Sequence, residues 1–504
     1  MIMDKSPSIL KDFSLYKEVA FFPTIGQGTI HNLTHLPSQT SIEHGDEPNC
    51  RKHDILVASL LPSFENSSSS RCCNLYSFST VQNSLVTSTK SFDFNYLPVA
   101  DIVCINSFYD EFSRNYVVAM GLVKEEGSCY FNIYSGRSLS SLPEKFICLS
   151  ELDHFPVQVV HTYFISPNTQ KMQWACLLST SGQLTSALDL NQNCPSWKPV
   201  QVYTRLLDAI PPQEKATEGI SRRQGLKFYA SETPLTSSGD ESQSCRGAAD
   251  PSAKSIFGLI DSTTTCNLFP ELRNLPSRVV TYMDFFLLDD GEMKYRLSAF
   301  GTLDGWIGVG LVDMKKSELR AFYSASHDSI ITKLKFFRQF NQNSNSPSDI
   351  SLLVCSGLEP AAVYRCPFDG NGEGKLSIGS RIILPQSVDF DQVNCACVAD
   401  LDFDGQPEIV IGTFGQQLLF YKWISQPGSD KEGSYLLVHQ RRMVGAVHSL
   451  ECGDDCDFLG DGTQSLAVLT TSGLHIFHCS HLLDFCLPLL DARLQSLPSS
   501  FKCP

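Results

Sequence analysis

The chain has 504 residues, 42% hydrophobic and 18% charged, which is enough apolar material for a large core and excludes wholesale disorder. Lys and Arg number 39 against 54 Asp and Glu, and this charge of −15 argues against nucleic-acid binding, which needs a cationic footprint. No apolar run is long enough to span a bilayer, and the first 25 residues lack the unbroken apolar core of a signal peptide. Nineteen cysteines stand mostly singly along the chain, a pattern typical of reduced, buried thiols in a cytoplasmic protein.

Short apolar runs rich in Val, Ile, Leu, Phe and Tyr recur along the chain, each bounded by Gly, Asn, Asp, Ser or Pro. Runs of this length and composition predict β-strands rather than helices. Almost every run is followed, after a short turn, by a second apolar run, so the recurring unit is a strand–turn–strand hairpin. The first strands of these seven hairpins are expected within 54–61, 116–123, 173–179, 295–301, 350–357, 407–415 and 465–473.

The hairpins recur at an even spacing. Matching positions in their second strands lie 57, 54, 122, 54, 57 and 56 residues apart, so only the third interval departs from a period near 55. A constant period of this size, with several strands in each unit, predicts an all-β fold of radial repeats, a seven-bladed β-propeller. Two separate β-sandwiches are the alternative, although they would not require an even period. The matching positions are Tyr76, Ile133, Ala187, Val309, Val363, Phe420 and Ile476.

The period divides the chain into four parts. Residues 1–194 would hold three blades, with a strand near Glu18–Ile25 that pairs with the last blade and covers its open edge. Residues 195–265 form a low-complexity insertion with too few apolar residues to offset the entropy of ordering, so we expect it to be flexible. Residues 266–480 would hold blades four to seven, and 481–504 a short C-terminal helix and tail. Weaker strands are expected within 92–108, 155–165, 329–337, 394–401 and 445–452.

The strongest local motif is an acidic turn in the sixth hairpin, DLDFDGQPEIVIG at 400–412. Alternate carboxylates in a tight turn point inward together and offer a hard cation its oxygen ligands, while Gly405 permits a bend with positive φ. The turn resembles the calcium loop of integrin-type FG-GAP propeller repeats, and it predicts a structural Ca²⁺ rather than a required cofactor. A metal-free Asx-type turn is the alternative. The candidate ligands are Asp400, Asp402, Asp404, Gln406 through its backbone carbonyl, and Glu408.

Other groups of polar residues are weaker candidates for a metal or catalytic site. The next hairpin repeats the acidic frame from Asp457 but loses two of the four side-chain ligands, and 284–301 holds a more degraded version. A zinc site built from Cys452, Cys456, His475 and His478 would not have zinc-finger spacing. No hydrolase, metalloprotease or nucleotide-binding motif stands in a strand–helix setting, so the sequence predicts no enzyme.

Several segments resemble the kaptin family. The most specific is DFDQVNCACVADLDFDGQPEIVIGTFGQQLLFYK at 389–422, together with RLSAFGTLDGWIGVGLVD at 296–313 and LLVCSGLEPAAVYR at 352–365. The resemblance covers most of the chain outside 195–265 and the N-terminal loops. It is strongest from 266 to 478.

The resemblance implies a function that composition and spacing alone do not indicate. Kaptin-like proteins belong to the KICSTOR assembly, with a second FG-GAP-type propeller and a large scaffold subunit. That assembly holds the GATOR GTPase-activating complex at the lysosome and restrains the TOR kinase when amino acids are scarce. A non-enzymatic scaffold, cytoplasmic and at the lysosomal surface through its complex, is therefore the leading hypothesis.

An actin-filament-associated protein of motile cell edges is the alternative, and it also comes from the family resemblance. Actin is acidic, so a chain with a charge of −15 would need a clustered basic face to bind it directly. The basic clusters are modest and stand at 221–223, 315–316 and 441–442.

Overall fold

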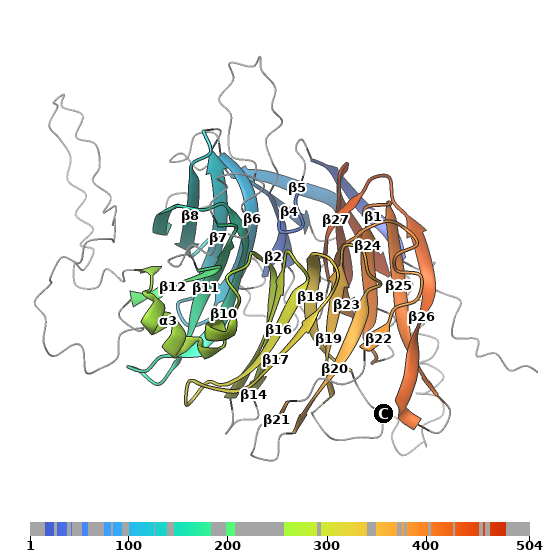
Figure 1. Ribbon diagram of the computed structural model, residues 1–504. Coiled ribbons are helices and arrows are strands. Elements are labelled where there is room, and N and C mark those ends of the chain that lie inside the picture. Colours follow the sequence, from blue (N-terminus) through green and yellow to red (C-terminus); the bar gives the residue numbers. More distant parts are fainter. Residues whose placement is uncertain are drawn as a thin grey trace, which may run out of the picture.

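The described strands form seven antiparallel sheets that stand as blades around a common axis in the computed structural model (Figure 1). This architecture confirms the predicted all-β, seven-bladed propeller. The structure describes residues 16–24, 28–37, 42, 53–58, 75–81, 84–92, 100–124, 126–138, 146–182, 198–206, 257–289, 294–339, 349–369, 375–376, 381–401, 405–426, 429–452, 457–458 and 464–479.

The first four blades each contain four strands and follow one another along the chain. The first blade contains β2 (Leu33–Pro37), β3 (His53–Ala58), β4 (Leu75–Val81) and β5 (Ser84–Phe92). The second contains β6 (Ala100–Asp110), β7 (Asn115–Lys124), β8 (Cys129–Gly136) and β9 (Phe146–Leu152). The third contains β10 (Pro156–Ile165), β11 (Met172–Thr180), β12 (Val200–Arg205) and β13 (Phe257–Leu259). The fourth contains β14 (Val280–Asp289), β15 (Lys294–Thr302), β16 (Trp306–Asp313) and β17 (Glu318–Ser326).

The last three blades follow the same plan, with an additional short strand in the fifth and a contribution from the N-terminal region in the seventh. The fifth contains β18 (Ile331–Arg338), β19 (Asp349–Ser356), β20 (Ala362–Asp369), β21 (Lys375–Leu376) and β22 (Arg381–Ile383). The sixth contains β23 (Val393–Ala399), β24 (Glu408–Thr413), β25 (Gln417–Gln426) and β26 (Ser429–Arg442). The seventh contains β27 (Val447–Glu451), β28 (Ser465–Thr470), β29 (Gly473–Cys479) and β1 (Tyr16–Pro23).

Burial explains why the second strand of a blade reads as a continuous apolar run. Both faces of a blade are covered by its neighbours, so β24 and β28 are buried along their whole length. The outermost strand β17 is mostly exposed or half-buried. The weaker strands expected from the sequence supply the innermost strands β6, β10, β18, β23 and β27, each of which contacts the innermost strands of the adjacent blades.

The third blade differs from the expected hairpin. The expected second strand at 183–190 lies outside the described residues, and β11 pairs with β12 instead. β13 then pairs with β12, so both ends of the expected insertion 195–265 belong to the propeller. Val202 and Tyr203, apolar residues in an otherwise polar stretch, are fully buried in the blade, which explains why β12 forms within the range expected for the insertion. Residues 207–256 lie outside the described residues.

The ring closes through the N-terminal strand. β1 pairs antiparallel with β29 on the outside of the seventh blade, with Tyr16 opposite Cys479. This pairing confirms the expected closing strand near Glu18–Ile25. On the inside, β27 contacts β2 and completes the circle of innermost strands. The C-terminal helix expected at 481–504 lies outside the described residues.

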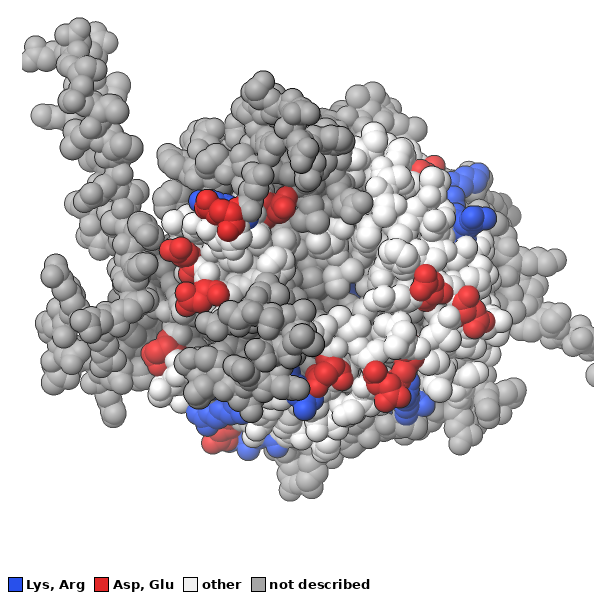
Figure 2. Space-filling model, turned by 45° about the horizontal axis from the view of Figure 1, so that its top comes forward, with Lys and Arg blue, Asp and Glu red and all other residues white. Residues whose placement is uncertain are grey.

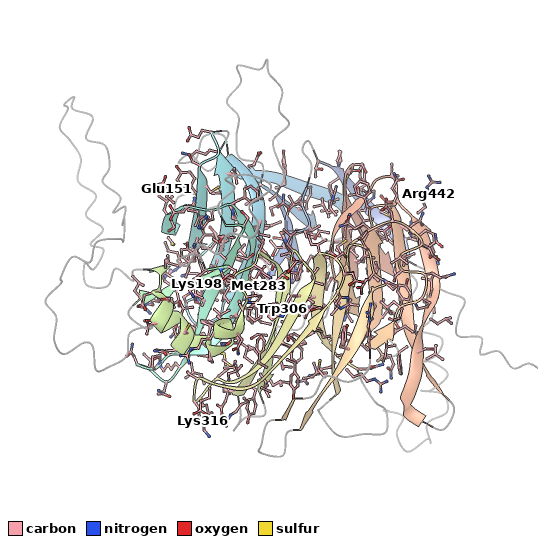
Figure 3. All side chains as sticks on the ribbon, viewed as in Figure 1. Glu151, Lys198, Met283, Trp306, Lys316 and Arg442 are labelled. Carbon is pink, nitrogen blue, oxygen red and sulfur yellow. The ribbon has the colours of Figure 1, made fainter. Side chains whose placement is uncertain are left out.

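Strand alternation sorts the connections onto two faces of the ring. Connections between the second and third strands of a blade, and those from one blade to the next, lie on one face, which we call the upper face. Figure 2 brings this face forward. In Figure 3, Glu151 and Arg442, near the ends of outermost strands, lie toward the top, and Lys316, between third and fourth strands, lies at the bottom.

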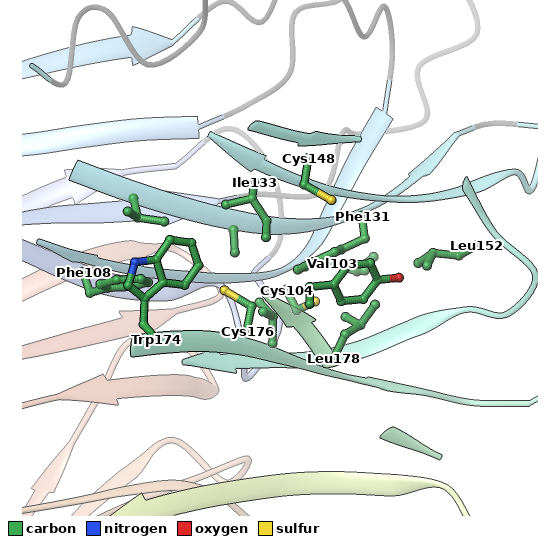
Figure 4. Packing of buried hydrophobic residues seen from close by; sticks show 14 of the residues in the cluster. Val103, Cys104, Phe108, Phe131, Ile133, Cys148, Leu152, Trp174, Cys176 and Leu178 are labelled. Carbon is green, nitrogen blue, oxygen red and sulfur yellow. The ribbon is translucent and has the colours of Figure 1, made fainter. Parts of the chain in front are cut away.

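The core consists of apolar layers between neighbouring blades. Between the second and third blades, Phe131 of β8 and Cys176 of β11 belong to one buried cluster (Figure 4). Trp174 lies edge-on to Phe108 in the same cluster, with ring centroids 5.1 Å apart. Because full burial of a large apolar side chain contributes about 1.5–3 kcal/mol, these layers supply much of the stability of the ring.

A short helical segment joins the third and fourth blades. It consists of α3 (Ser262–Leu268) and the 3₁₀ helix η6 (Pro270–Asn274). Asp261 caps α3, because its Oδ1 accepts hydrogen bonds from the backbone N–H groups of Thr263 at 2.9 Å and Thr264 at 3.0 Å. No helix within the described ranges is long and apolar enough to cross a membrane.

Candidate functional site

The acidic turn of the sixth blade connects β23 to β24. The backbone N–H of Gly405 donates a hydrogen bond to Asp400 Oδ2 at 2.9 Å. Gly405 has a φ of 84°, a conformation that glycine adopts without strain. Asp402 and Asp404 lie outside the described residues, and Gln406 is half-buried beside the bend. The ligand roles of all these residues therefore stay a prediction.

Glu408, the last acidic residue of this turn, is fully buried. Its Oε2 accepts a hydrogen bond from the backbone N–H of Leu401 at 2.8 Å. Its Oε1 lies 3.4 Å from Nζ of Lys422, a buried cation on the neighbouring strand β25. Sequence reasoning missed Lys422, although one lysine inside the apolar run QLLFYKW is a signal that a buried partner of opposite charge is needed.

Lys422 changes what the turn can do chemically. Its ammonium group already compensates the charge of Glu408, so a cation beside Glu408 would have to compete with it. The residues therefore fit Ca²⁺ best if Asp400, Asp402 and Asp404 supply most of the oxygen ligands. Among the described residues, no three His, Cys, Asp or Glu side chains are grouped closely enough to hold a metal.

The two weaker acidic turns occupy the same connection in their own blades. The turn at Asp457 lies between β27 and β28, and the turn within 284–301 lies between β14 and β15. Asp457 is buried, whereas Asp461 lies outside the described residues. All three turns therefore join the first and second strands of a blade, while membership of the FG-GAP class stays a prediction.

The two histidines of β29 have different partners. His475 Nδ1 lies 3.0 Å from Glu18 Oε1 on the closing strand β1. His478 Nδ1 lies 3.2 Å from Ser465 Oγ on β28. His475 therefore helps to hold β1 against the last blade.

Charged side chains gather on the innermost strands, around the axis of the propeller. Lys333 Nζ of β18 lies 4.9 Å from the ring centre of Tyr282, and Lys335 Nζ lies 4.0 Å from Asp284 Oδ1 on β14. Burial alone would raise the pKa of Glu451, but the contact with His35, with smaller effects from Lys333 and Lys335, holds it below its usual value. Two cations and two carboxylates thus compensate one another, and this axial cluster carries no excess of one sign.

Two histidines beside the axial cluster are neutral at physiological pH. Burial, with a smaller effect from Lys333, lowers the pKa of His31 to about 3. Burial, with a smaller effect from His35, lowers the pKa of His161 to about 4. His161 stacks on Phe108 at 4.2 Å between ring centroids, and its Nδ1 lies 2.7 Å from Asn106 Oδ1.

A buried ion pair fixes the segment between blades three and four. Arg296 of β15 donates hydrogen bonds from Nε and Nη2 to Glu271 Oε1 at 3.1 and 2.8 Å, and both side chains are almost fully buried. Arg296 Nη1 also donates to the carbonyl of Tyr163 in blade three at 2.8 Å. Its guanidinium lies 4.4 Å from the ring centre of Phe269. This clamp joins η6 and two blades, and sequence reasoning missed it.

A second polar network lies on the upper face of the fifth blade. Glu359 Oε2 lies 2.7 Å from His327 Nδ1 and accepts a hydrogen bond from Arg381 Nη2, also at 2.7 Å. The backbone N–H of Asp328 donates to Glu359 Oε1 at 2.7 Å. Partial burial alone would raise the pKa of Glu359, but these hydrogen bonds hold it below its usual value. The network fixes the two connections that carry it.

A cavity beside α3 has a volume of about 610 Å³. Its lining includes Asp153, Lys198 and Arg273, so charges of both signs face it. This mixture selects no single class of ligand.

Ten cysteines of the described ranges are free, and eight of them are buried. Burial raises the pKa of Cys104, Cys148 and Cys355 to about 12. Thiols with such pKa values are poor nucleophiles, so they act as small apolar core residues, as the sequence predicted.

Solved structures similar to this chain have low sequence identity to it. A chain of the crystal structure of BBS1N in complex with ARL6DN, soaked with lead, has a TM-score of 0.45 and 10% identity, covering 93% of this chain and 98% of that one. The Cps50 (Swd1) β-propeller domain of Myceliophteria thermophila has a TM-score of 0.42 and 10% identity, covering 92% and 99%.

Sequence comparisons are more specific. A curated mouse (Mus musculus) protein, "KICSTOR complex protein kaptin", is 29% identical over 406 residues, which are 78% of this chain and 76% of the relative. The family model described as "KICSTOR complex protein kaptin" matches residues 16–188 and 260–484, which together include strands of all seven blades. The chain therefore belongs to the kaptin family.

Proposed function

We propose that this chain is a non-enzymatic scaffold subunit of a KICSTOR-like complex. The observation that carries the proposal is the family match, which runs through both parts of the ring, at 16–188 and 260–484. The name of the mouse relative places that relative in the KICSTOR complex. The match covers about three quarters of both chains. We therefore extend the relative's place in such a complex to this chain.

Features of the fold support a binding role rather than a chemical one. The charges of the axial cluster compensate one another, and the buried thiols have raised pKa values that make them unreactive. A rigid ring with two loop-bearing faces is a common platform for protein partners. These features favour a subunit that positions other proteins.

The finer proposal concerns nutrient signalling. In it, the complex recruits the GATOR GTPase-activating complex to lysosomes and restrains TOR signalling when amino acids are scarce. Direct partners would then be other KICSTOR-type subunits, including a second propeller and a large scaffold, with GATOR bound indirectly.

The test combines purification with a signalling assay. Affinity purification of the tagged full chain from amino-acid-starved cells should recover KICSTOR-type subunits. Cells that lack the protein should keep TOR signalling active during starvation, and re-expression should restore its inhibition. If knockout cells silence TOR as fast as normal cells, the signalling part of the proposal is wrong.

Direct actin binding is the weaker alternative. The basic clusters that it would use do not form one face, because Lys316 and Arg442 lie toward opposite ends of the molecule (Figure 3). The cluster at 221–223 lies outside the described residues. Co-sedimentation with filamentous actin across a salt series would test it, and salt-sensitive binding at micromolar affinity would revive this alternative.

A further inference from the structure

Exposed apolar side chains gather on the upper face of blades four to six. Within the described ranges, five large apolar residues stand in the upper-face connections of these blades, and we call them the apolar crescent. They are Leu303, Leu358, Val388, Phe414 and Val444, with exposed fractions of 40%, 79%, 40%, 55% and 82%. Single exposed apolar residues are ordinary, but a contiguous group on one face marks an interaction site.

Hydrogen bonds connect the loops of the crescent to neighbouring connections. The backbone N–H of Leu358 donates to Ser329 Oγ at 2.9 Å, which ties it to the connection between blades four and five. The N–H of Phe414 donates to the Gln392 carbonyl at 2.8 Å, which ties it to the connection between blades five and six. The connection between blades four and five is also tied to the Leu303 loop, because the N–H of His327 donates to the Gly305 carbonyl at 2.9 Å. Neighbouring loops that carry the crescent are therefore hydrogen-bonded to one another or to a shared connection.

Hydrogen bonds also fix the ends of the crescent. At one end, the N–H of Leu303 donates to the Val279 carbonyl at 2.9 Å. At the other, the N–H of Met443, next to Val444, donates to the Gln416 carbonyl at 2.8 Å. A surface held in this way loses little conformational entropy when a partner binds.

The carboxylates within the crescent indicate the chemistry of the partner. Asp328 is exposed in the connection between blades four and five, and Asp389 and Asp391 are exposed in the connection between blades five and six. None of the three forms an ion pair with a Lys or Arg among the described residues. The acids Asp304 and Glu359, in contrast, are paired with arginines. On the described part of this face, acidic side chains are more prominent than basic ones (Figure 2).

We propose that the apolar crescent docks an apolar segment of a partner protein that also carries Lys or Arg side chains. Apolar contacts would supply the affinity, and the three aspartates would orient the basic side chains at the rim. The same acidic rim disfavours an anionic membrane surface or a nucleic acid. This inference rests on the proposed scaffold function, for which it names one surface and the kind of segment that binds there.

The first test uses a probe of the proposed chemistry. A fluorescent 16-residue amphipathic peptide of Leu and Lys should bind the full chain, whereas a Leu and Glu peptide of the same pattern should not. The double variant Leu358→Ser/Phe414→Ser should weaken binding about tenfold or more, because truncating central apolar anchors commonly costs that much. The double variant keeps the net charge, so non-specific attraction to an acidic protein would not be affected.

Two further variants test whether the aspartates contribute to binding and whether binding is specific to the crescent. Asp389→Asn/Asp391→Asn should weaken binding severalfold at low salt and flatten its salt dependence. Phe112→Ser is the matched control, because Phe112 is 78% exposed on the lower face of blade two. This control should bind as the wild type does, and equal melting temperatures would show that every variant is folded.

Several outcomes would overturn the inference. Equal binding of the Leu–Lys peptide to wild type and to Leu358→Ser/Phe414→Ser would do so, as would stronger binding of the Leu–Glu peptide. If light scattering shows a dimer that only the double variant loses, the occupant is a second copy of this chain and the basic partner is wrong. Failure to recover KICSTOR-type subunits with the wild-type chain would instead contradict the scaffold function, which the peptide assay does not depend on.

Discussion

At the scale of single residues, the fold depends on a few charged groups that are buried with a partner. Arg296 and Glu271 are the clearest case, because their side chains are 1% and 0% exposed. A buried pair contributes little net stability compared with apolar residues, but one charge left without its partner is costly. The clamp therefore makes the fold sensitive to changes at either residue.

We expect Arg296→Met to lower the free energy of unfolding by about 3–5 kcal/mol, because Glu271 would remain buried without its cation. Chemical denaturation would measure the change. Arg278→Ala, which removes a half-exposed partner of Asp304, should cost less than about 1 kcal/mol. If the two variants lose equal stability, the clamp is not the critical contact.

The calcium prediction also belongs to this scale. Millimolar Ca²⁺ should raise the melting temperature of the wild type, because a ligand that binds only the native state stabilises it. Asp402→Ala should remove that shift, whereas Asp461→Ala, in the weaker turn of blade seven, should keep it. The same melting temperature in Ca²⁺ and in chelator would leave a metal-free turn as the correct interpretation.

His161 predicts a dependence of stability on pH. Its folded pKa of about 4 lies below the ordinary value of 6.5, so the unfolded chain binds more protons between these values. Stability is therefore fully present above pH 6.5 and is lost as the pH falls toward 4. Because His161 is half-buried rather than fully buried, we expect a loss of about 1 kcal/mol from this group between pH 6.5 and 5. Denaturation at both pH values should show a smaller loss in His161→Gln, and an unchanged pH dependence would contradict the assignment.

At the scale of elements, β1 is the strand on which closure depends. Phe22 is 7% exposed and contacts Phe78 of the first blade at 4.7 Å between ring centroids, whereas its neighbour Phe21 is 45% exposed. β1 therefore contributes both an edge pairing with β29 and a side chain that packs against the next blade.

Phe22→Ala should destabilise the protein by about 3 kcal/mol, because removing a buried aromatic ring leaves a cavity between blades seven and one. Phe21→Ala, on the same strand, should cost less than about 1 kcal/mol. Urea denaturation of the two variants would compare them directly. A larger effect at Phe21 would mean that the register of β1 differs from the one described.

The sequence predicted most elements because the blades repeat. Six hairpins could be located from their apolar runs, and the closing strand from the need to cover an edge. β12 of the third blade could not be located because it is short and lies beyond a polar stretch, so no periodic pattern identifies it. Lys422 and the Glu271–Arg296 pair could not be assigned because a partner of opposite charge is recognised only when the strands are placed side by side.

At the scale of the whole molecule, the blades form one interlocked unit. Each innermost strand contacts those of the two adjacent blades, and apolar clusters continue from blade to blade. Separate blades would expose these clusters, so we expect one cooperative unfolding transition.

The double variant Phe22→Ala/Arg296→Met tests this cooperativity. The changes lie on blades seven and four, so their effects on the free energy of unfolding should add within about 0.5 kcal/mol. Tryptophan fluorescence and far-ultraviolet circular dichroism should report the same midpoint. Two separate transitions, one sensitive to each substitution, would show that the ring unfolds in parts.

The pairing of β1 with β29 has a consequence for synthesis of the chain. Glu18 and its contact His475 are separated by 457 residues. At a ribosomal rate of about 5–20 residues per second, β1 would wait roughly 20–90 seconds for its partner strand. During that interval both β1 and the growing end of the ring present unpaired edges, which other chains can join. The cell must therefore protect the nascent chain from such pairing until the last blade has been synthesised.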